Sequence, residues 1–137
     1  MSKTNKGYIH LYMGEHISHT PTILGQCLRA SGAGFKIHYI NFSDNDYDRL
    51  FEQKLDGLKI TTFVDDNTLN FDYIFKDYDM LILDNIDHHF DSNNLTNFSQ
   101  NLIENKPYKL ELILCAKSFE QSIIDKADLV SKAISVS

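Results

Sequence analysis

The residues best suited to chemistry lie between positions 8 and 25, where an apolar strand leads through a short loop into a helix. This layout is typical of phosphate-binding loops. In such loops glycines let the backbone wrap a phosphate, a lysine neutralises it, and the N-terminus of the helix offers free N–H groups. Gly14 is in the expected place, but Ser18-His19 stands where a glycine-lysine pair is expected before Thr20. The segment keeps the layout of a phosphate site and has lost its fixed cation.

The acid that ends the clearest apolar run is a second candidate for the same site. Residues 79–84 read Asp-Met-Leu-Ile-Leu-Asp, which indicates a strand buried on both faces of a parallel sheet. In phosphate-loop proteins an acid at this position helps to organise magnesium. Thr20 and Asp84 would therefore form the metal site and hold a hydrated Mg²⁺ weakly. An alternative of equal weight is that Asp84 only caps the turn after its strand.

Histidines offer a different metal chemistry in the same region. Four of them fall in two predicted loops, and these are His16, His19, His88 and His89. Together with Asp84 and Asp87 they are ligand types suited to zinc or nickel. Ordinary surface histidines are the default interpretation.

Strand and helix signals alternate along the chain. We expect strands at 7–13, 35–42, 58–64, 79–84, 110–115 and 129–136, and helices at 21–32, 44–55, 69–78, 92–104 and 118–126. This alternation predicts an α/β fold, a three-layer α/β/α sandwich with a mostly parallel sheet, similar to the P-loop NTPases. Ligands of such folds bind beyond the carboxyl ends of the strands. The rule brings the 14–20 loop, the residues after Phe42 and the 84–89 segment to one rim.

Several side chains within these elements have structural roles in this scheme. Thr20 is the expected N-cap of the first helix, which Gly32 or Gly34 would end, and Ile23, Leu24 and Leu28 would line one of its faces. His10 and His38 fall within strands and should be packed or solvent-facing residues of the sheet. Cys27 and Cys115 lie among apolar residues without metal or redox spacing, which predicts ordinary buried thiols.

Composition limits the class of protein and of partner. The chain has 137 residues, of which 42% are hydrophobic and 23% charged, and this predicts a single domain over 1–137 with a flexible lead at 1–6. A net charge of −6 argues against nucleic acid or an anionic membrane as the main partner. No apolar run approaches the roughly 20 residues that cross a bilayer, so we expect a cytoplasmic protein.

Taken together, these segments resemble the ATP:corrinoid adenosyltransferases. That family has a loop of the type YTGNGKGKTTAALG, which Tyr12 to Gly25 follow, and then a segment of the type LALRAxGxG, which Cys27 to Gly34 follow closely. Its strand of the type DLVVLDELN resembles residues 79–86, and its C-terminal ADLV is identical to residues 127–130. The likeness spans most of residues 7–137. The family's tryptophan-bearing middle segment and basic C-terminal tail are absent.

The resemblance implies transfer of the 5'-deoxyadenosyl group of ATP to the cobalt of a corrinoid, with the phosphates held by the 14–20 loop. The residues concerned are Gly14, Glu15, His16, Ile17, Ser18, His19 and Thr20. His19 and Ile17 stand at the family's two loop lysines, and losing two charged hydrogen bonds costs about 3 to 6 kcal/mol, or two to four decades of affinity. We therefore expect an adenosyltransferase-like protein with an eroded site, which binds ATP with Mg²⁺ or a corrinoid weakly and has a binding or regulatory role.

Two alternatives stay open at this point. In the first, the protein is an active adenosyltransferase in which His19 serves as the phosphate cation and a partner supplies the missing corrinoid contacts. In the second, it is a protein-interaction module without a small-molecule ligand. No catalytic residue can be named, and a homodimer is compatible with the resemblance.

Overall fold

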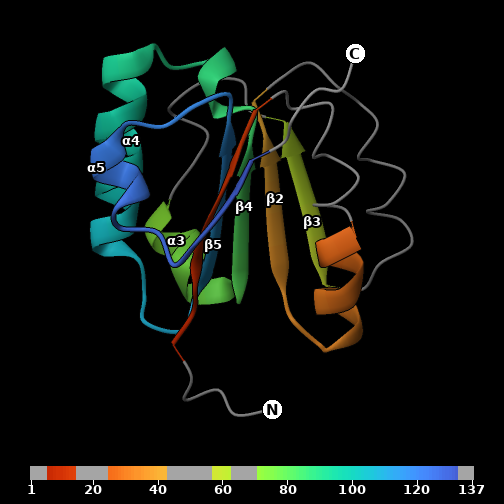
Figure 1. Cartoon of the computed structure of the whole chain (residues 1–137). Helices are drawn as coiled ribbons and strands as arrows, with labels where there is room; N and C mark the ends of the chain where they lie inside the picture. The colour runs from red at the N-terminus through yellow and green to blue at the C-terminus, as the bar shows by residue number, and fades with distance from the viewer. Residues whose placement is uncertain (1–5, 15–24, 43–56, 63–70, 133–137) are drawn as a thin grey trace.

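Six parallel strands form one sheet in the computed structural model, which describes residues 6–14, 25–42, 57–62 and 71–132 (Figure 1). The strands are β1 (Ile9–Met13), β2 (Ile37–Asn41), β3 (Leu58–Thr62), β4 (Met80–Asp84), β5 (Glu111–Ala116) and β6 (Leu129–Lys132). Their order across the sheet is β3-β2-β4-β5-β1-β6, and every neighbouring pair is parallel. β1 therefore lies between the two strands that come last in sequence.

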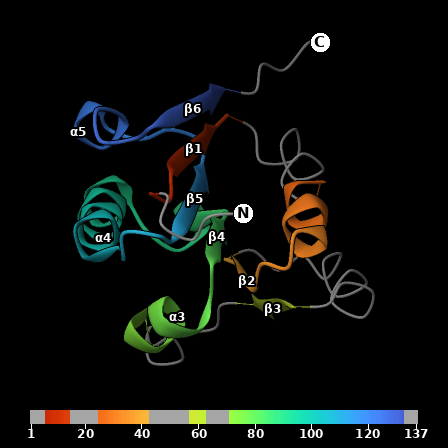
Figure 2. The same ribbon diagram turned by 90° about the horizontal axis from the view of Figure 1, so that it is seen from below.

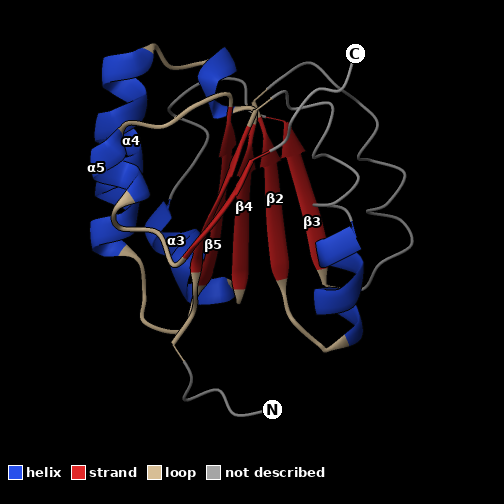
Figure 3. Cartoon of the chain, viewed as in Figure 1, coloured by secondary structure: helices blue, strands red, loops and turns tan. Residues whose placement is uncertain are grey.

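Helices cover both faces of the sheet. They are α3 (Phe71–Asp77), the 3-10 helix η2 (Ile86–His88), α4 (Ser92–Asn105), α5 (Gln121–Ile124) and a helix whose described part spans residues 25–32. Figure 2 shows α3, α4 and α5 on one side of the sheet and the 25–32 helix on the other, and Figure 3 shows the same layers by type of element. The predicted three-layer fold with a parallel sheet is confirmed.

The alternation of side chains along each strand divides the core in two. On β5, Leu112 and Leu114 pack towards α4 and α5, whereas Ile113 and Cys115 pack towards the 25–32 helix. All four are 3% exposed or less. A strand buried on both faces is apolar at nearly every position, which explains why the β4 and β5 segments read as nearly continuous apolar runs.

α4 illustrates how the sequence sets one helix of the outer layer. The Asp91 side chain accepts a hydrogen bond from the Asn94 backbone N–H at 2.9 Å, which caps the first turn. Leu95, Ser99 and Leu102 then recur at helical spacing and form its buried face. Among the described residues, no helix is both long and apolar enough to cross a bilayer.

Most predicted elements are confirmed within the described residues, including the short helix expected at 69–78, which is α3. Two predictions are wrong in part. Leu28 is 55% exposed, because the 25–32 helix presents Cys27 and Ala30 to the sheet. The helix expected at 118–126 is only the four residues of α5. The helix expected at 44–55, together with Thr20, Pro21, Ile23 and Leu24, lies outside the described residues.

Candidate functional site

The carboxyl end of β1 starts the loop that the sequence marks as a phosphate site. Gly14 has a φ of 110°, a backbone conformation that residues with a Cβ rarely adopt. Its N–H donates to the carbonyl of Lys117, just beyond β5, at 3.0 Å. This hydrogen bond holds the carboxyl ends of β1 and β5 side by side. Glu15, His16, Ile17, Ser18, His19 and Thr20 lie outside the described residues.

The rim forms a point where neighbouring strands lead to opposite faces of the sheet. The chain after β1 leads to the 25–32 helix, whereas the chain after β5 leads to α5 on the other face (Figure 2). β2 and β4 are also neighbours in the sheet, and the chain after β4 leads to α4, on the same face as α5. In open parallel sheets, ligand-binding crevices form at such points, beyond the carboxyl ends of the strands.

A row of polar side chains crosses the sheet at this end. Tyr12 is the register partner of Cys115, and Asn41 is the register partner of Asp84. The β4–β5 register aligns Leu83 with Leu114, which places Asp84 and Cys115 one step further along. Polar groups within otherwise apolar strands are costly unless they find partners, so this row either has a function or is internally satisfied.

Asp84 is engaged inside the protein. Its side chain has no solvent exposure, and the Tyr39 hydroxyl donates to its Oδ2 at 2.5 Å. The backbone N–H of Phe42 donates to the carbonyl of Asp84 at 3.0 Å. Asp84 thus links the ends of β2 and β4. Thr20, its proposed partner on magnesium, is not among the described residues.

Cys115 is the neighbour of Asp84 on the other side. Burial raises the pKa of the Cys115 thiol well above its usual range, and the charge of Asp84 and a side-chain hydrogen bond with it raise this pKa further. The thiol therefore stays protonated at neutral pH and is unsuited to act as a thiolate nucleophile. Cys27 and Cys115 are both buried thiols, as predicted.

The turn after β4 is built by two asparagines. Asn85 has a φ of 59° and a ψ of 39°, the left-handed conformation that asparagine tolerates better than most residues. Its Nδ2 donates to Oδ1 of Asn41 at 2.9 Å, and both residues are 2% exposed. This bond joins the ends of β2 and β4 a second time. Beyond the turn, Asp87 Oδ2 accepts the backbone N–H of Lys117 at 3.2 Å, so η2 is tied to the end of β5.

A cavity of about 540 Å³ opens at this rim on the α4 face. Its lining includes Asp87, Asp91, Lys117, Phe90, Phe119 and Glu120. Three carboxylates against a single lysine make this cavity a poor place for a triphosphate. It is large enough for a small molecule of neutral or cationic character.

The histidines of the described rim do not form a metal centre. His88 and His89 are exposed, and His89 lies near the ring of Phe42, with a centroid distance of 6.3 Å. Within the described part of the chain, no group of three or more histidines, cysteines or acids is placed to hold a metal ion. His16 and His19 lie outside it.

The two strand histidines behave as predicted for residues of the sheet. His10 is half-buried and stacks on Tyr12, with ring centroids 4.2 Å apart. His38 is 5% exposed and its ring lies 4.9 Å from that of Tyr78. Burial lowers the pKa of His10, so its imidazole is neutral at physiological pH.

Sequence reasoning missed the side chains that join the ends of β2 and β4. Tyr39, Asn41 and Asn85 make the contacts that hold the ends of β2 and β4 together. A signal was present, because Asn41 is the last residue but one of a predicted strand and Asn85 directly follows another. Only the strand order, in which β2 lies beside β4, shows that these residues meet.

The fold and the rim define an all-parallel α/β protein with a switch-point crevice. The chain matches no protein-family model and no curated protein.

Proposed function

We propose that the protein is adenosyltransferase-like, with an eroded ATP site at the loop after β1, and that it has a binding or regulatory role with weak or no catalysis. The observation that carries this proposal is the position of Gly14. It ends β1 at the switch point of a parallel sheet, in a left-handed conformation, just before the segment with the phosphate-loop layout. A ligand of that loop would lie at the usual place for nucleotides in such folds.

The charges argue for weak rather than tight binding. The loop has His19 and Ile17 where the resembled family has lysines, and the nearby cavity is lined by three carboxylates. Asp84 is fully buried and accepts the Tyr39 hydroxyl, which favours a structural role over magnesium binding. Both features support a non-catalytic protein rather than an active ATP:corrinoid adenosyltransferase.

Restoring the loop cations tests the proposal. We expect His19→Lys with Ile17→Lys to tighten binding of Mg-ATP and of inorganic tripolyphosphate at least about tenfold in titration calorimetry, because each charged hydrogen bond is worth about 1.5 to 3 kcal/mol. The control is Asn93→Lys with Asn97→Lys, which adds the same charge to exposed positions of α4. An equal gain in the control would mean that net charge alone is responsible.

The pH dependence of binding separates the alternatives. If ATP raises the melting temperature of the wild-type protein more at about pH 6 than at about pH 8, protonated His19 acts as the phosphate cation and an active site gains support. If neither the wild-type protein nor the double-lysine variant responds to millimolar ATP, tripolyphosphate or cobalamin, the eroded-site proposal fails. The interaction module would then be the remaining alternative.

A further inference from the structure

The strand β6 ends the sheet on one side, and no described element lies beyond it (Figure 2). Leu129 is 52% exposed and Val130 is 43% exposed, so two consecutive large apolar side chains of an edge strand are open to solvent. Natural edges are usually blunted by proline, bulges or charged side chains. Residues 129–132 read Leu-Val-Ser-Lys, so only Lys132 serves that purpose here.

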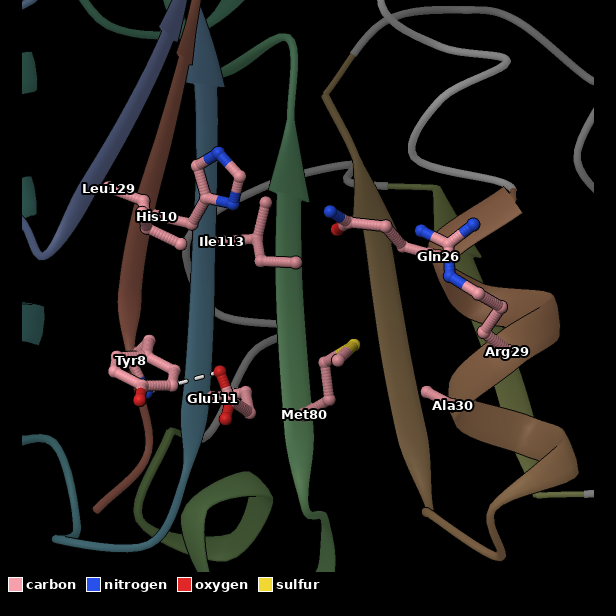
Figure 4. Close-up of a pocket in the computed structure, with 9 residues that line it drawn as sticks. All are labelled: Tyr8, His10, Gln26, Arg29, Ala30, Met80, Glu111, Ile113 and Leu129. Atoms are coloured by element: carbon pink, nitrogen blue, oxygen red, sulfur yellow. Dashed lines mark hydrogen bonds between the residues drawn. The ribbon is translucent and has the colours of Figure 1, made fainter. Parts of the chain in front are cut away.

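The apolar side chains of β6 lie on both faces of the sheet. Val130 is the register partner of Leu11, which belongs to the part of the core beneath α4 and α5. Leu129 is the register partner of His10 and lines a groove of about 340 Å³ on the opposite face, on the side away from the 25–32 helix (Figure 4). A partner that covers both faces of this edge must continue the sheet.

The register shows which backbone groups of β6 point outwards. The N–H of Leu112 on β5 donates to the carbonyl of Tyr8 at 2.9 Å. Backbone groups of successive residues in a strand point to alternate sides, so Leu11 turns its own groups to β6. In a parallel pair such a residue bonds to the two neighbours of its register partner, which is Val130. The N–H and C=O of Val130 therefore point away from β1, towards the free edge.

We propose that this edge pairs with β6 of a second copy of the chain, antiparallel, about a two-fold axis at Val130. A two-fold interface uses the same surface on both copies, and two copies of one strand related in this way run antiparallel. At the axis, Val130 exchanges both backbone hydrogen bonds with Val130 of the second copy, and their side chains pack on the α5 face. On the other face Leu129 lies opposite Ser131 of the second copy.

The charges of the segment favour a second copy as the partner. Residues 128–132 read Asp-Leu-Val-Ser-Lys, so the two-fold axis places Asp128 opposite Lys132 of the second copy at both ends. Asp128 is held in place, because its Oδ2 accepts the Ile9 N–H at 2.8 Å and Lys6 Nζ lies 4.0 Å from its Oδ1. Its side chain is 29% exposed, which leaves room for a second cation. The next register that keeps the backbone bonds would place Lys132 opposite Val130 and leave both charges without a counterpart.

The interface is small, so we expect a weak dimer. Pairing of two such short strands buries less than about 1,200 Å², the range of weak and transient complexes, and a dissociation constant of about 10 to 100 µM is expected. β6 is then largely free at a few micromolar. The proposal does not involve the loop after β1, so it stands whether or not that loop binds ATP.

Sedimentation velocity tests the association. At about 0.15 M salt, which screens the repulsion between two chains of net charge −6, the wild-type protein should pass from monomer to dimer between about 5 and about 500 µM. A protein that stays monomeric up to about 500 µM would overturn the proposal. Assemblies that grow beyond the dimer would also overturn it, because a two-fold interface closes on itself.

Variants locate the interface. Val130→Lys places two like charges together at the axis and should weaken the dimer at least about tenfold. Lys132→Glu faces Asp128 of the second copy at both ends and should weaken it about tenfold. The matched control is Lys76→Glu on α3, which makes the same change in net charge far from β6 and should leave the dimer unchanged (Figure 2). If Lys132→Glu and Lys76→Glu have equal effects, or if a folded Val130→Lys dimerises as the wild-type protein does, the interface lies elsewhere and the proposal fails.

Hydrogen exchange by NMR tests the pairing itself. The amide of Val130 points outwards in the monomer and is hydrogen-bonded in the dimer, so its protection should rise at least about tenfold between about 20 and about 500 µM. The amide of Tyr73 on α3 should exchange at the same rate at both concentrations. A dimer in which Val130 gains no protection would not use the edge of β6, and this outcome would overturn the proposal even if sedimentation showed association.

Discussion

The hydroxyl of Tyr39 donates to a carboxylate that has no contact with solvent. Removing the hydroxyl leaves Asp84 with one donor fewer in a place where water cannot replace it. We therefore expect Tyr39→Phe to lower the free energy of unfolding by about 1.5 to 3 kcal/mol in urea denaturation. Tyr108→Phe is the control, because Tyr108 is 64% exposed and should lose almost nothing. Equal effects of the two substitutions would show that the buried bond contributes little to stability.

His10 makes stability depend on pH in the mildly acidic range. Its pKa is lowered by burial, so below the unfolded value of about 6.5 the unfolded chain binds the proton more readily than the folded one. The stability due to neutral His10 is complete above that value and is lost as the pH falls towards the lowered pKa of the folded state.

His10→Gln should therefore reduce the fall in melting temperature between about pH 7.5 and about pH 5. His88→Gln, which replaces an exposed histidine after β4, should keep the wild-type dependence. The melting temperatures of the three proteins, measured by circular dichroism across this range, make the comparison. If His10→Gln follows the wild-type curve, the burial of His10 has no influence on stability.

At the scale of elements, Gly7 shows how closely the chain approaches itself before β1. A Cβ at this position would lie 2.1 Å from the carbonyl oxygen of Leu110 and 2.6 Å from that of Lys109. Both are backbone atoms, so relief requires β1 and β5 to move apart. Gly7→Ala should destabilise the protein by about 1 to 3 kcal/mol or more.

The matched control for Gly7 is another glycine-to-alanine change. A Cβ added at Gly32, at the end of the 25–32 helix, would have no atom within 4 Å. Gly32→Ala should therefore be neutral or stabilising by up to about 1 kcal/mol. Chemical denaturation of both variants gives the comparison. A Gly7→Ala protein as stable as the wild type would mean that the start of β1 adjusts easily.

The elements themselves could largely be predicted from the sequence, because buried parallel strands leave continuous apolar runs such as that of β4. The buried face of the 25–32 helix could not be predicted from the sequence. We expected Leu28 on this face because it is large and apolar, but the helix packs on the sheet through the small side chains of Cys27 and Ala30. The position of the candidate site at the carboxyl ends of the strands could be predicted from the sequence. The contact of Tyr39 with Asp84 could not, because it depends on the order of the strands in the sheet, and the local sequence pattern does not give that order.

For the molecule as a whole, burial predicts where the sheet opens first. Leu81, Leu83, Leu112 and Leu114 have no exposure, whereas Leu129 and Val130 of the outermost strand β6 are 52% and 43% exposed. We expect amide hydrogen exchange to be slowest in β4 and β5 and much faster in β6, since local opening follows the density of buried contacts. Equal protection of β6 and β5 would contradict this order and would indicate that something covers β6 in solution.

The place of β1 between β5 and β6 also determines when the protein can fold during its synthesis. The backbone N–H of Ile9 bonds to Asp128, which is 119 positions further along the chain. At about 5 to 20 residues per second, the ribosome would need roughly 6 to 24 s to make both strands that flank β1. Throughout that interval the nascent chain carries an unpaired apolar strand. Chaperones that recognise such segments would therefore meet this protein early, and residues 8–13 are where they would be expected to bind.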